Sequence, residues 1–160
     1  FEARVEFDKT GRPQLLDRFG LSVEVRSPDD VTERIEVIKR RDAFETDHAA
    51  FMAHYGAEDA KIRDTILKAR KRLPRIDTPE AILEQCAALC IALGSDGLRG
   101  ELTLLRTARA LAAYQGKRKL TPDHLRAVAP SALSHRLRRD PLDEAGSGTR
   151  VLRVVDEVLG

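Results

Sequence analysis

The chain has 160 residues, a formal net charge of +2 at pH 7, 42% hydrophobic residues and 4% aromatic residues. This length suits one domain, or one small domain with part of another. The nearly balanced charge gives no bulk attraction to nucleic acid, and no apolar run reaches the length of a membrane span. The many Ala, Leu and charged residues favour a mainly α-helical protein with a modest aliphatic core.

The N-terminal stretch predicts a mixed α/β segment. Partial alternation of apolar and polar residues predicts a strand over 1–11, and Leu21–Val25 predicts a second short strand. Between them, Pro13 and Gly20 favour the start and end of a short helix over 12–20. Two short strands do not make a stable sheet, so missing residues or another chain must supply the rest of this body.

Helical periodicity dominates the next part of the chain. It predicts a helix over 31–44, a second over 47–55 that Gly56 ends, and a third over 57–73 that Pro74 ends. The third helix has a basic face, but acidic residues interleave with it. We therefore interpret that face as a solvated surface.

A strong helix-start signal, Asp77-Thr78-Pro79-Glu80, predicts a helix that runs to about Leu93. Its circumference is largely apolar, so we expect it to be the buried centre of the helical domain. Cys86 and Cys90 fall on one face, where they are expected to pack as small hydrophobic groups. No further Cys or His grouping suggests a zinc site, and two helical thiols without a targeting signal favour a reducing cytoplasm.

The following stretch reads as a loop that leads into a long helix. Gly94 can end the preceding helix, and Ser95 or Asp96 can cap the next one. Arg99 falls in the first turn, where the helix dipole disfavours a cation. Local features leave two readings open: Arg99 points at an external anion, or it is a surface residue paired with a carboxylate such as Glu101. The expected apolar face consists of Leu98, Leu102, Leu105 and Leu111.

The C-terminal third predicts a capped helix over about 121–137 and a short amphipathic helix over 150–159. We interpret the lone His124 and His135 as surface or capping groups rather than ligands. The charge cluster over 136–144 suits a solvated helix end, an anion-facing patch or a subunit-facing patch.

Three separated motifs carry a specific resemblance. They are Arg12-Pro-Gln-Leu-Leu-Asp-Arg-Phe-Gly20, Ser95-Asp-Gly-Leu-Arg-Gly-Glu101 and His135-Arg-Leu-Arg-Arg-Asp-Pro-Leu-Asp-Glu144. In this order they resemble the C-terminal part of the I subunits of magnesium chelatase, which are AAA+ ATPases of chlorophyll and bacteriochlorophyll synthesis. The resemblance covers about residues 12–160.

The resemblance implies a mainly α fold, an all-helical AAA+ lid domain preceded by a short remnant of the α/β AAA+ nucleotide-binding core. Residues 1–25 would be the C-terminal edge of that core, with the arginine-finger helix and a strand. Residues 26–75 would be a helical connecting segment, and residues 76–160 the helical lid that carries the sensor-2 residue.

By the same resemblance, Arg18 is the arginine finger that reaches the nucleotide of a neighbouring subunit in trans. Asp17 is expected at the same subunit interface, and Arg99 is the sensor-2 residue over the nucleotide of its own subunit. A guanidinium suits both places because it stays charged and binds phosphate oxygens bidentately. Hydrolysis or exchange would then reorient the lid against the core.

The chain also departs from the family pattern. The family has an Asn-Pro-Glu-Glu-Gly sequence before the arginine-finger helix, whereas this chain has Glu6–Gly11 there and no Asn anywhere. It has no Gly-x-x-x-x-Gly-Lys-Ser/Thr loop for phosphate. The expected cofactors, ATP and Mg²⁺, would thus be bound mainly by residues outside this chain, which alone should be inactive and has no assigned metal ligand.

The resemblance implies a homo-oligomeric ring that works with the D subunit and the porphyrin-binding H subunit, in a bacterial cytoplasm or a plastid stroma. The ring would couple ATP hydrolysis to Mg²⁺ insertion into protoporphyrin IX. Two alternatives are the non-hydrolysing D subunit of the same complex and a MoxR-type AAA+ chaperone ATPase. The absence of an acidic, Pro-rich continuation favours the I subunit over D, and the cluster at 135–144 argues against MoxR.

Overall fold

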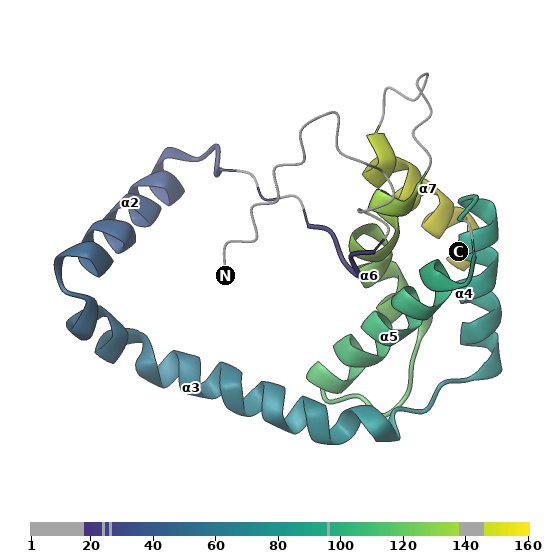
Figure 1. Ribbon diagram of the computed structural model, residues 1–160, viewed down its shortest axis with the longest axis horizontal. Helices are drawn as coiled ribbons and strands as arrows, with labels where there is room; N and C mark the ends of the chain where they lie inside the picture. Colours follow the sequence, from purple (N-terminus) through teal and green to yellow (C-terminus); the bar gives the residue numbers. More distant parts are fainter. Residues whose placement is uncertain (1–17, 24, 26, 96, 138–145) are drawn as a thin grey trace.

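The computed structural model describes residues 18–23, 25, 27–95, 97–137 and 146–160 (Figure 1). This part of the chain contains six α-helices and two short 3₁₀ helices, and no strand is found in it. The α-helices are α2 (Val31–Thr46), α3 (His48–Arg72), α4 (Glu80–Ala92), α5 (Arg99–Tyr114), α6 (Pro122–Leu133) and α7 (Gly146–Leu159), and the 3₁₀ helices are η1 (Leu73–Arg75) and η2 (Ser134–Arg136). The mainly α fold is confirmed. The strand predicted over 1–11 and most of the helix predicted over 12–20 lie outside the described residues.

The strand predicted over Leu21–Val25 is wrong for the residues of it that the structure describes. A strand needs a neighbouring strand to receive its backbone hydrogen bonds. Here the amide of Ser22 instead donates to the carbonyl of Ser131, at 2.8 Å, near the end of α6. This segment is therefore held by a helix end rather than by a sheet.

Helices α2 and α3 form an arm that extends away from a bundle made by α4 to α7 (Figure 1). The corner of the arm is Asp47, which ends α2 and caps α3 by accepting a hydrogen bond from the amide of Ala50 at 2.9 Å. No residue of α2 is buried, and Ala69 is the one buried residue of α3. The arm is therefore built from local helix interactions more than from a core.

Gly56 does not end a helix, so the predicted break at this position is wrong. Helix α3 is continuous from His48 to Arg72, and the φ angle of Gly56 is not positive. A glycine inside a helix costs only about 1 kcal/mol relative to alanine, which good helix formers on both sides can offset. The predicted stop near Pro74 is confirmed, because α3 passes into η1 there.

Helix α5 lies at the centre of the bundle and packs against α3, α4 and α6. Its expected apolar face is only partly correct: Leu105 and Leu111 pack on the core, but Leu98 is 73% exposed and Leu102 is 45% exposed. The buried face instead consists of Gly100, Leu104, Ala108, Ala112 and Ala113. These mostly small side chains let the neighbouring helices approach closely.

Helix α4 buries one face rather than its whole circumference. Cys86, Leu89 and Cys90 are buried, as expected for small hydrophobic groups at this spacing, whereas Ile91 is 76% exposed. The expectation that this helix forms the centre of the domain is therefore wrong, since α5 holds that place.

The N-terminus of α6 confirms the capping interpretation of His124. Thr121 and His124 form a reciprocal capping box, with the Thr121 amide donating to Nδ1 of His124 at 3.1 Å. The histidine is buried rather than on the surface, at 6% exposure.

Candidate functional site

Arg99 is the first residue of α5, and its side chain is exposed. Two glycines, Gly94 and Gly97, adopt left-handed backbone conformations with φ of 67° and 70°, which turns the chain from α4 into α5. The helix begins after Leu98 without a side-chain cap, so the predicted cap by Ser95 is wrong. Asp96, the other predicted cap, lies outside the described residues. Leu98, which occupies the N-cap position, has no side-chain acceptor to offer the amide groups of the first turn.

Ser95 contributes to the site by packing rather than by capping. A Cβ atom at Gly100 would lie 2.6 Å from Oγ of Ser95 and 3.3 Å from Sγ of Cys90. Glycine at position 100 thus lets the loop and the end of α4 press against the first turn of α5. This contact fixes the backbone from which Arg99 projects.

Behind this turn, the thiols of α4 lie near the carboxylate of Glu101. Burial raises the pKa of Cys86 to about 11 and that of Cys90 to about 12, and the charge of Glu101 adds to both shifts. Both thiols are therefore protonated at neutral pH, which suits packing and not nucleophilic chemistry.

Arg18 lies in an exposed turn, and Asp17 lies outside the described residues. The next residue, Phe19, is hydrogen-bonded to η2, more than a hundred residues later in the chain. Its carbonyl oxygen accepts a hydrogen bond from Nη2 of Arg136 at 2.8 Å and lies 3.0 Å from Nε2 of His135. The arginine-finger segment predicted from sequence is thus anchored on η2.

Arg136 also contacts the helix that begins with Arg99. Its Nη2 lies 3.3 Å from Oγ1 of Thr103, and its Nε donates to the carbonyl of Ala132 at 3.0 Å. Thr103 follows Arg99 by four residues, so both lie on one face of α5. The structure therefore joins the two elements that carry the predicted arginines through a residue to which the sequence analysis gave no such role. The signals around this residue were the charge density over 136–144 and the motif over 135–144, of which residues 138–144 lie outside the described part.

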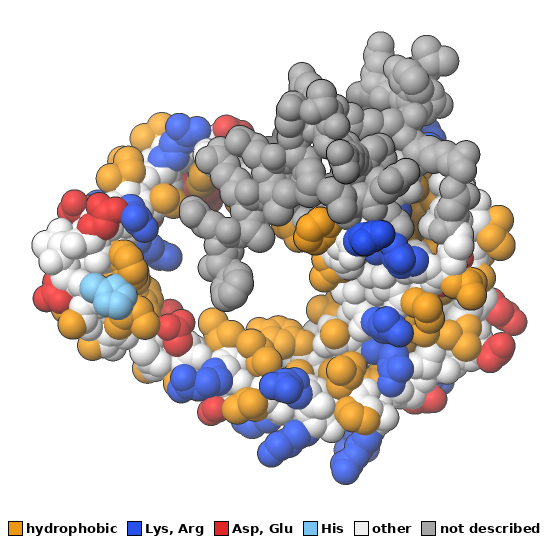
Figure 2. All heavy atoms as spheres, viewed as in Figure 1, with side chains coloured by type: hydrophobic (Ala, Val, Ile, Leu, Met, Phe, Trp, Pro, Cys, Tyr) orange, Lys and Arg blue, Asp and Glu red, His pale blue; other side chains and the backbone are white. Residues whose placement is uncertain are grey.

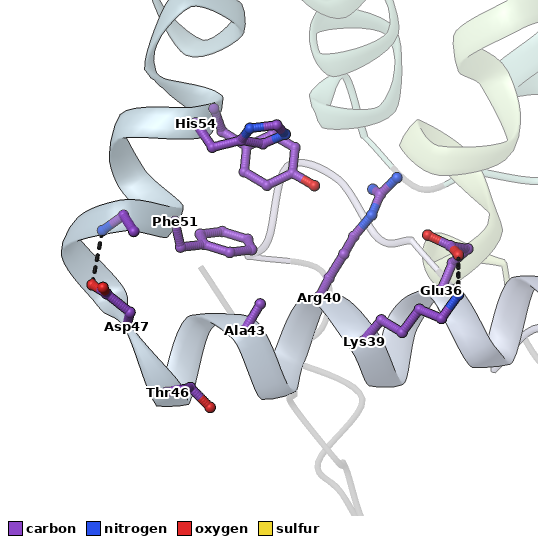
Figure 3. A pocket seen from close by; sticks show the side chains of 10 residues that line it. Glu36, Lys39, Arg40, Ala43, Thr46, Asp47, Phe51 and His54 are labelled. Carbon is purple, nitrogen blue, oxygen red and sulfur yellow. Dashed lines mark hydrogen bonds and ion pairs between the residues drawn. The ribbon is translucent and has the colours of Figure 1, made fainter.

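A separate groove of about 600 Å³ lies at the corner of the arm (Figure 3). Phe51 and His54 project from α3 towards α2, and the guanidinium of Arg40 lies 6.0 Å from the ring centroid of Tyr55. Phe44 and Phe51 meet edge to face at 5.5 Å, which braces the corner. Neither Arg18 nor Arg99 lines this groove, so it is not part of the arginine site.

Among the described residues, no group of three or more His, Cys, Asp or Glu is arranged to hold a metal ion. In the same part of the chain, none of the helices has the length and apolar character that crossing a membrane requires.

Comparison with known proteins agrees with this architecture. The model of the AAA lid domain family matches residues 83–155. The magnesium-chelatase 38 kDa subunit of Cereibacter sphaeroides is 68% identical over 148 residues, which are 92% of this chain and 44% of that protein. The corresponding subunit of Rhodobacter capsulatus is 64% identical over 148 residues, 92% of this chain and 42% of its own length. The chain thus spans less than half the length of these relatives.

A crystal structure of a protein described as an ATPase, from Cytophaga hutchinsonii, superposes with a TM-score of 0.68 at 15% identity. The match covers 97% of this chain and 51% of that one. At this identity it supports the fold alone. The resemblance to the C-terminal part of the magnesium-chelatase subunit is confirmed by the sequence matches.

Proposed function

The chain belongs to the magnesium-chelatase 38 kDa subunit family, of which it carries the AAA lid region, and from this premise we propose that it is part of a ring-forming ATPase motor. The motor couples ATP hydrolysis to Mg²⁺ insertion into protoporphyrin IX. The observation that carries the proposal is Arg99, an exposed cation in the first turn of α5, inside the stretch that matches the AAA lid. The D subunit and a MoxR-type chaperone remain the alternatives of a related class.

In this proposal Arg99 acts as sensor 2 on the nucleotide of its own subunit. The side chain starts at a helix N-terminus, where the first-turn amide groups and the helix dipole favour an anion such as phosphate. The dipole that disfavours Arg99 locally is offset when a phosphate lies between them. The tight packing at Gly100 holds the base of this side chain in one place.

Arg18 supplies the arginine finger to the neighbouring subunit, with Asp17 at the same interface. A finger must project from the subunit surface, and Arg18 is exposed in a turn whose following residue is anchored. A guanidinium there stabilises the negative charge that spreads over the γ-phosphate during transfer. Bound ATP supplies the phosphoryl group and Mg²⁺ neutralises its charge.

The residues present suit the phosphates of ATP better than the metal. Both proposed contacts are guanidinium groups, and the described part of the chain holds no metal-binding cluster. In this proposal, Mg²⁺ and ATP are bound mainly by residues outside this chain, as the missing phosphate-binding loop led us to expect.

We extend the proposal to domains and partners. Residues 1–25 form the edge of the nucleotide-binding core, residues 26–75 the connecting segment and residues 76–160 the lid. The ring works with the D subunit and the porphyrin-binding H subunit, in the cytoplasm of a bacterium or the stroma of a plastid.

The two arginine roles can be tested in the assembled ATPase with Arg18→Ala and Arg99→Ala. Removal of an arginine finger costs about 10³-fold or more in kcat, so Arg18→Ala rings should bind ATP and fail to hydrolyse it. Arg99→Ala should change ATP affinity or turnover. Arg153→Ala, which removes an arginine that is 71% exposed on α7, is the matched control and should behave as wild type.

Mixing the two variants tests which subunit each arginine serves. In a ring of equal parts, about a quarter of the interfaces pair an intact Arg99 with an intact Arg18 from the next subunit, so hydrolysis should partly return. If both arginines served the same subunit's nucleotide, mixing would restore nothing. Full turnover by either single variant would remove that arginine from the site.

A further inference from the structure

The described hydrogen bonds of the segment that follows Arg18 meet one corner of the bundle. The carbonyl of Phe19 receives Arg136 and His135, and the amide of Ser22 donates to the carbonyl of Ser131. The corner is formed by the end of α6 and by η2. The position of this segment relative to the bundle therefore depends on that corner.

Arg136 is the residue that connects this corner to α5. Its planar guanidinium bonds to the backbone of Ala132 at the end of α6, to the backbone of Phe19 and to the hydroxyl of Thr103. A guanidinium has five N–H donors in a fixed fork, so it can hold three elements at set angles. A lysine ammonium is a point charge and does not reproduce that geometry.

The α5 side of this connection is rigid. Leu104, next to Thr103, is fully buried, and Gly100 is pressed against the loop and α4. Arg99 and Thr103 therefore move together, because close-packed interiors transmit displacement rather than absorb it. A shift of Arg99 towards or away from a nucleotide would carry Thr103 with it.

We propose that Arg136 is a positioning residue that couples neighbouring nucleotide sites, by linking the sensor-2 helix of one subunit to the arginine-finger segment of the same subunit. Arg99 reads the nucleotide bound to its own subunit, and Arg18 acts on the nucleotide of the next. The bonds of Arg136 to Thr103 and Phe19 transmit the first event to the second. This inference rests on the proposed function of Arg18 and Arg99.

The test uses Arg136→Gln and Arg136→Lys in the assembled ATPase, with Arg126→Gln as the control. Arg126 also joins two elements of the bundle, since its guanidinium pairs with Asp156 and bonds the carbonyl of Gly160 at 3.1 Å, but it touches neither arginine segment. Loss of a hydrogen bond to a charged group corresponds to about a ten- to hundredfold change in an equilibrium or a rate. We therefore expect kcat to fall by about that factor in both Arg136 variants. The KM for ATP should change less than about twofold, because substrate binding is not what Arg136 supports.

A second readout separates positioning from mere stability. The dependence of turnover on ATP concentration should lose its cooperativity in the Arg136 variants, since cooperativity requires coupled sites. Amide hydrogen exchange at Ser22 should accelerate as its anchor loosens. Arg126→Gln should leave kcat, cooperativity and Ser22 exchange at wild-type values. Its melting temperature measures how much the loss of one arginine link between two elements lowers stability.

Comparison of the single variants separates a failure of this inference from a failure of the proposed function. If Arg18→Ala and Arg99→Ala leave ATP binding and hydrolysis unchanged, the proposed function fails. If they are damaging while Arg136→Gln keeps wild-type kcat and cooperativity, only the coupling role of Arg136 is overturned. It is also overturned if Arg136→Lys restores full cooperativity, or if Arg126→Gln lowers kcat as much as Arg136→Gln.

Discussion

The orientation of α5 about its own axis decides where Arg99 points, and two leucines on this helix test it. Leu104 is completely buried in the bundle, whereas Leu102 is 45% exposed. The leucine pattern alone predicts the opposite preference, since it places Leu102 on the apolar face with Leu98 and Leu105. We therefore predict that Leu104→Ala is far more damaging to the fold than Leu102→Ala.

The magnitudes follow from burial. Replacing a fully buried leucine with alanine loses about 2 kcal/mol of transfer free energy, and the cavity left behind raises the cost to about 3–4 kcal/mol. Leu104 contributes to a core in which Ala108 and Leu125 are also fully buried, so little room exists for neighbours to collapse into the space. Leu102 keeps about half of its surface in water, so its truncation should cost about 1 kcal/mol or less.

Denaturant unfolding followed by far-UV circular dichroism measures both values. The two variants should differ by about 2–3 kcal/mol in the free energy of unfolding, with equal dependence on denaturant concentration. A matched loss in both variants, or a larger loss in Leu102→Ala, would mean that α5 is rotated from the position described. The direction of Arg99, and with it the sensor-2 assignment, would then have to be withdrawn.

Two further predictions concern the arm and the thiols. Gly56→Ala should stabilise α3 by about 0.5–1 kcal/mol, because a Cβ there meets nothing within 4 Å and the glycine backbone is helical; an unchanged helix content and unfolding midpoint would contradict this. The folded state holds the thiol protons of Cys86 and Cys90 more tightly than the unfolded chain, since their pKa values are raised from 9.0 to about 11 and about 12. The stability that they contribute is therefore complete below pH 9 and is lost as the pH rises through about 11. Between those limits, the free energy of unfolding measured in urea should fall more steeply with pH for the wild type than for the double variant Cys86→Ala, Cys90→Ala. Equal slopes for the two proteins would refute the argument.

The helices that the sequence predicted best are those with a strong local signal at the N-terminus. Asp30 caps α2 by accepting from the amide of Glu33, and the acidic, proline-led start of α4 lies where the pattern placed it. Gly56 shows the limit of such signals, because a breaker residue acts only when its neighbours do not favour the helix. The buried face of α5 was missed for another reason. Gly100, Ala108 and Ala112 look neutral in sequence, yet small residues are what a close helix contact needs.

The residues of the candidate site likewise include some that the sequence identified and one that it missed. Arg18 and Arg99 were identified through a family resemblance, because local chemistry alone left Arg99 open between an anion partner and a surface pair. Arg136 was missed because its partners at Phe19 and Ala132 are backbone carbonyls, and Phe19 lies 117 residues away in sequence. A carbonyl has no sequence signature, so only the fold shows which one an arginine reaches.

The junction between the arm and the bundle, like the corner at Arg136, is held by arginine side chains that donate to backbone carbonyls. Most helix stability in proteins comes from packing, yet the arm has almost no buried residue, and Figure 2 shows its apolar side chains exposed among charged ones. Two hydrogen bonds of opposite direction hold the base of the arm on α5. Arg72 donates to the carbonyl of Ala113 on α5, and Arg109 of α5 donates to the carbonyl of Leu73, each at 3.4 Å. Arginine side chains therefore join α5 to other elements on both sides, through carbonyl oxygens towards its C-terminus and through the hydroxyl of Thr103 towards its N-terminus. Because such bonds are directional and need little buried surface, they hold elements at defined angles without a shared core. A helix connected in this way can transmit a displacement at Arg99 to the rest of the chain, as the proposed role in an ATP-driven ring requires.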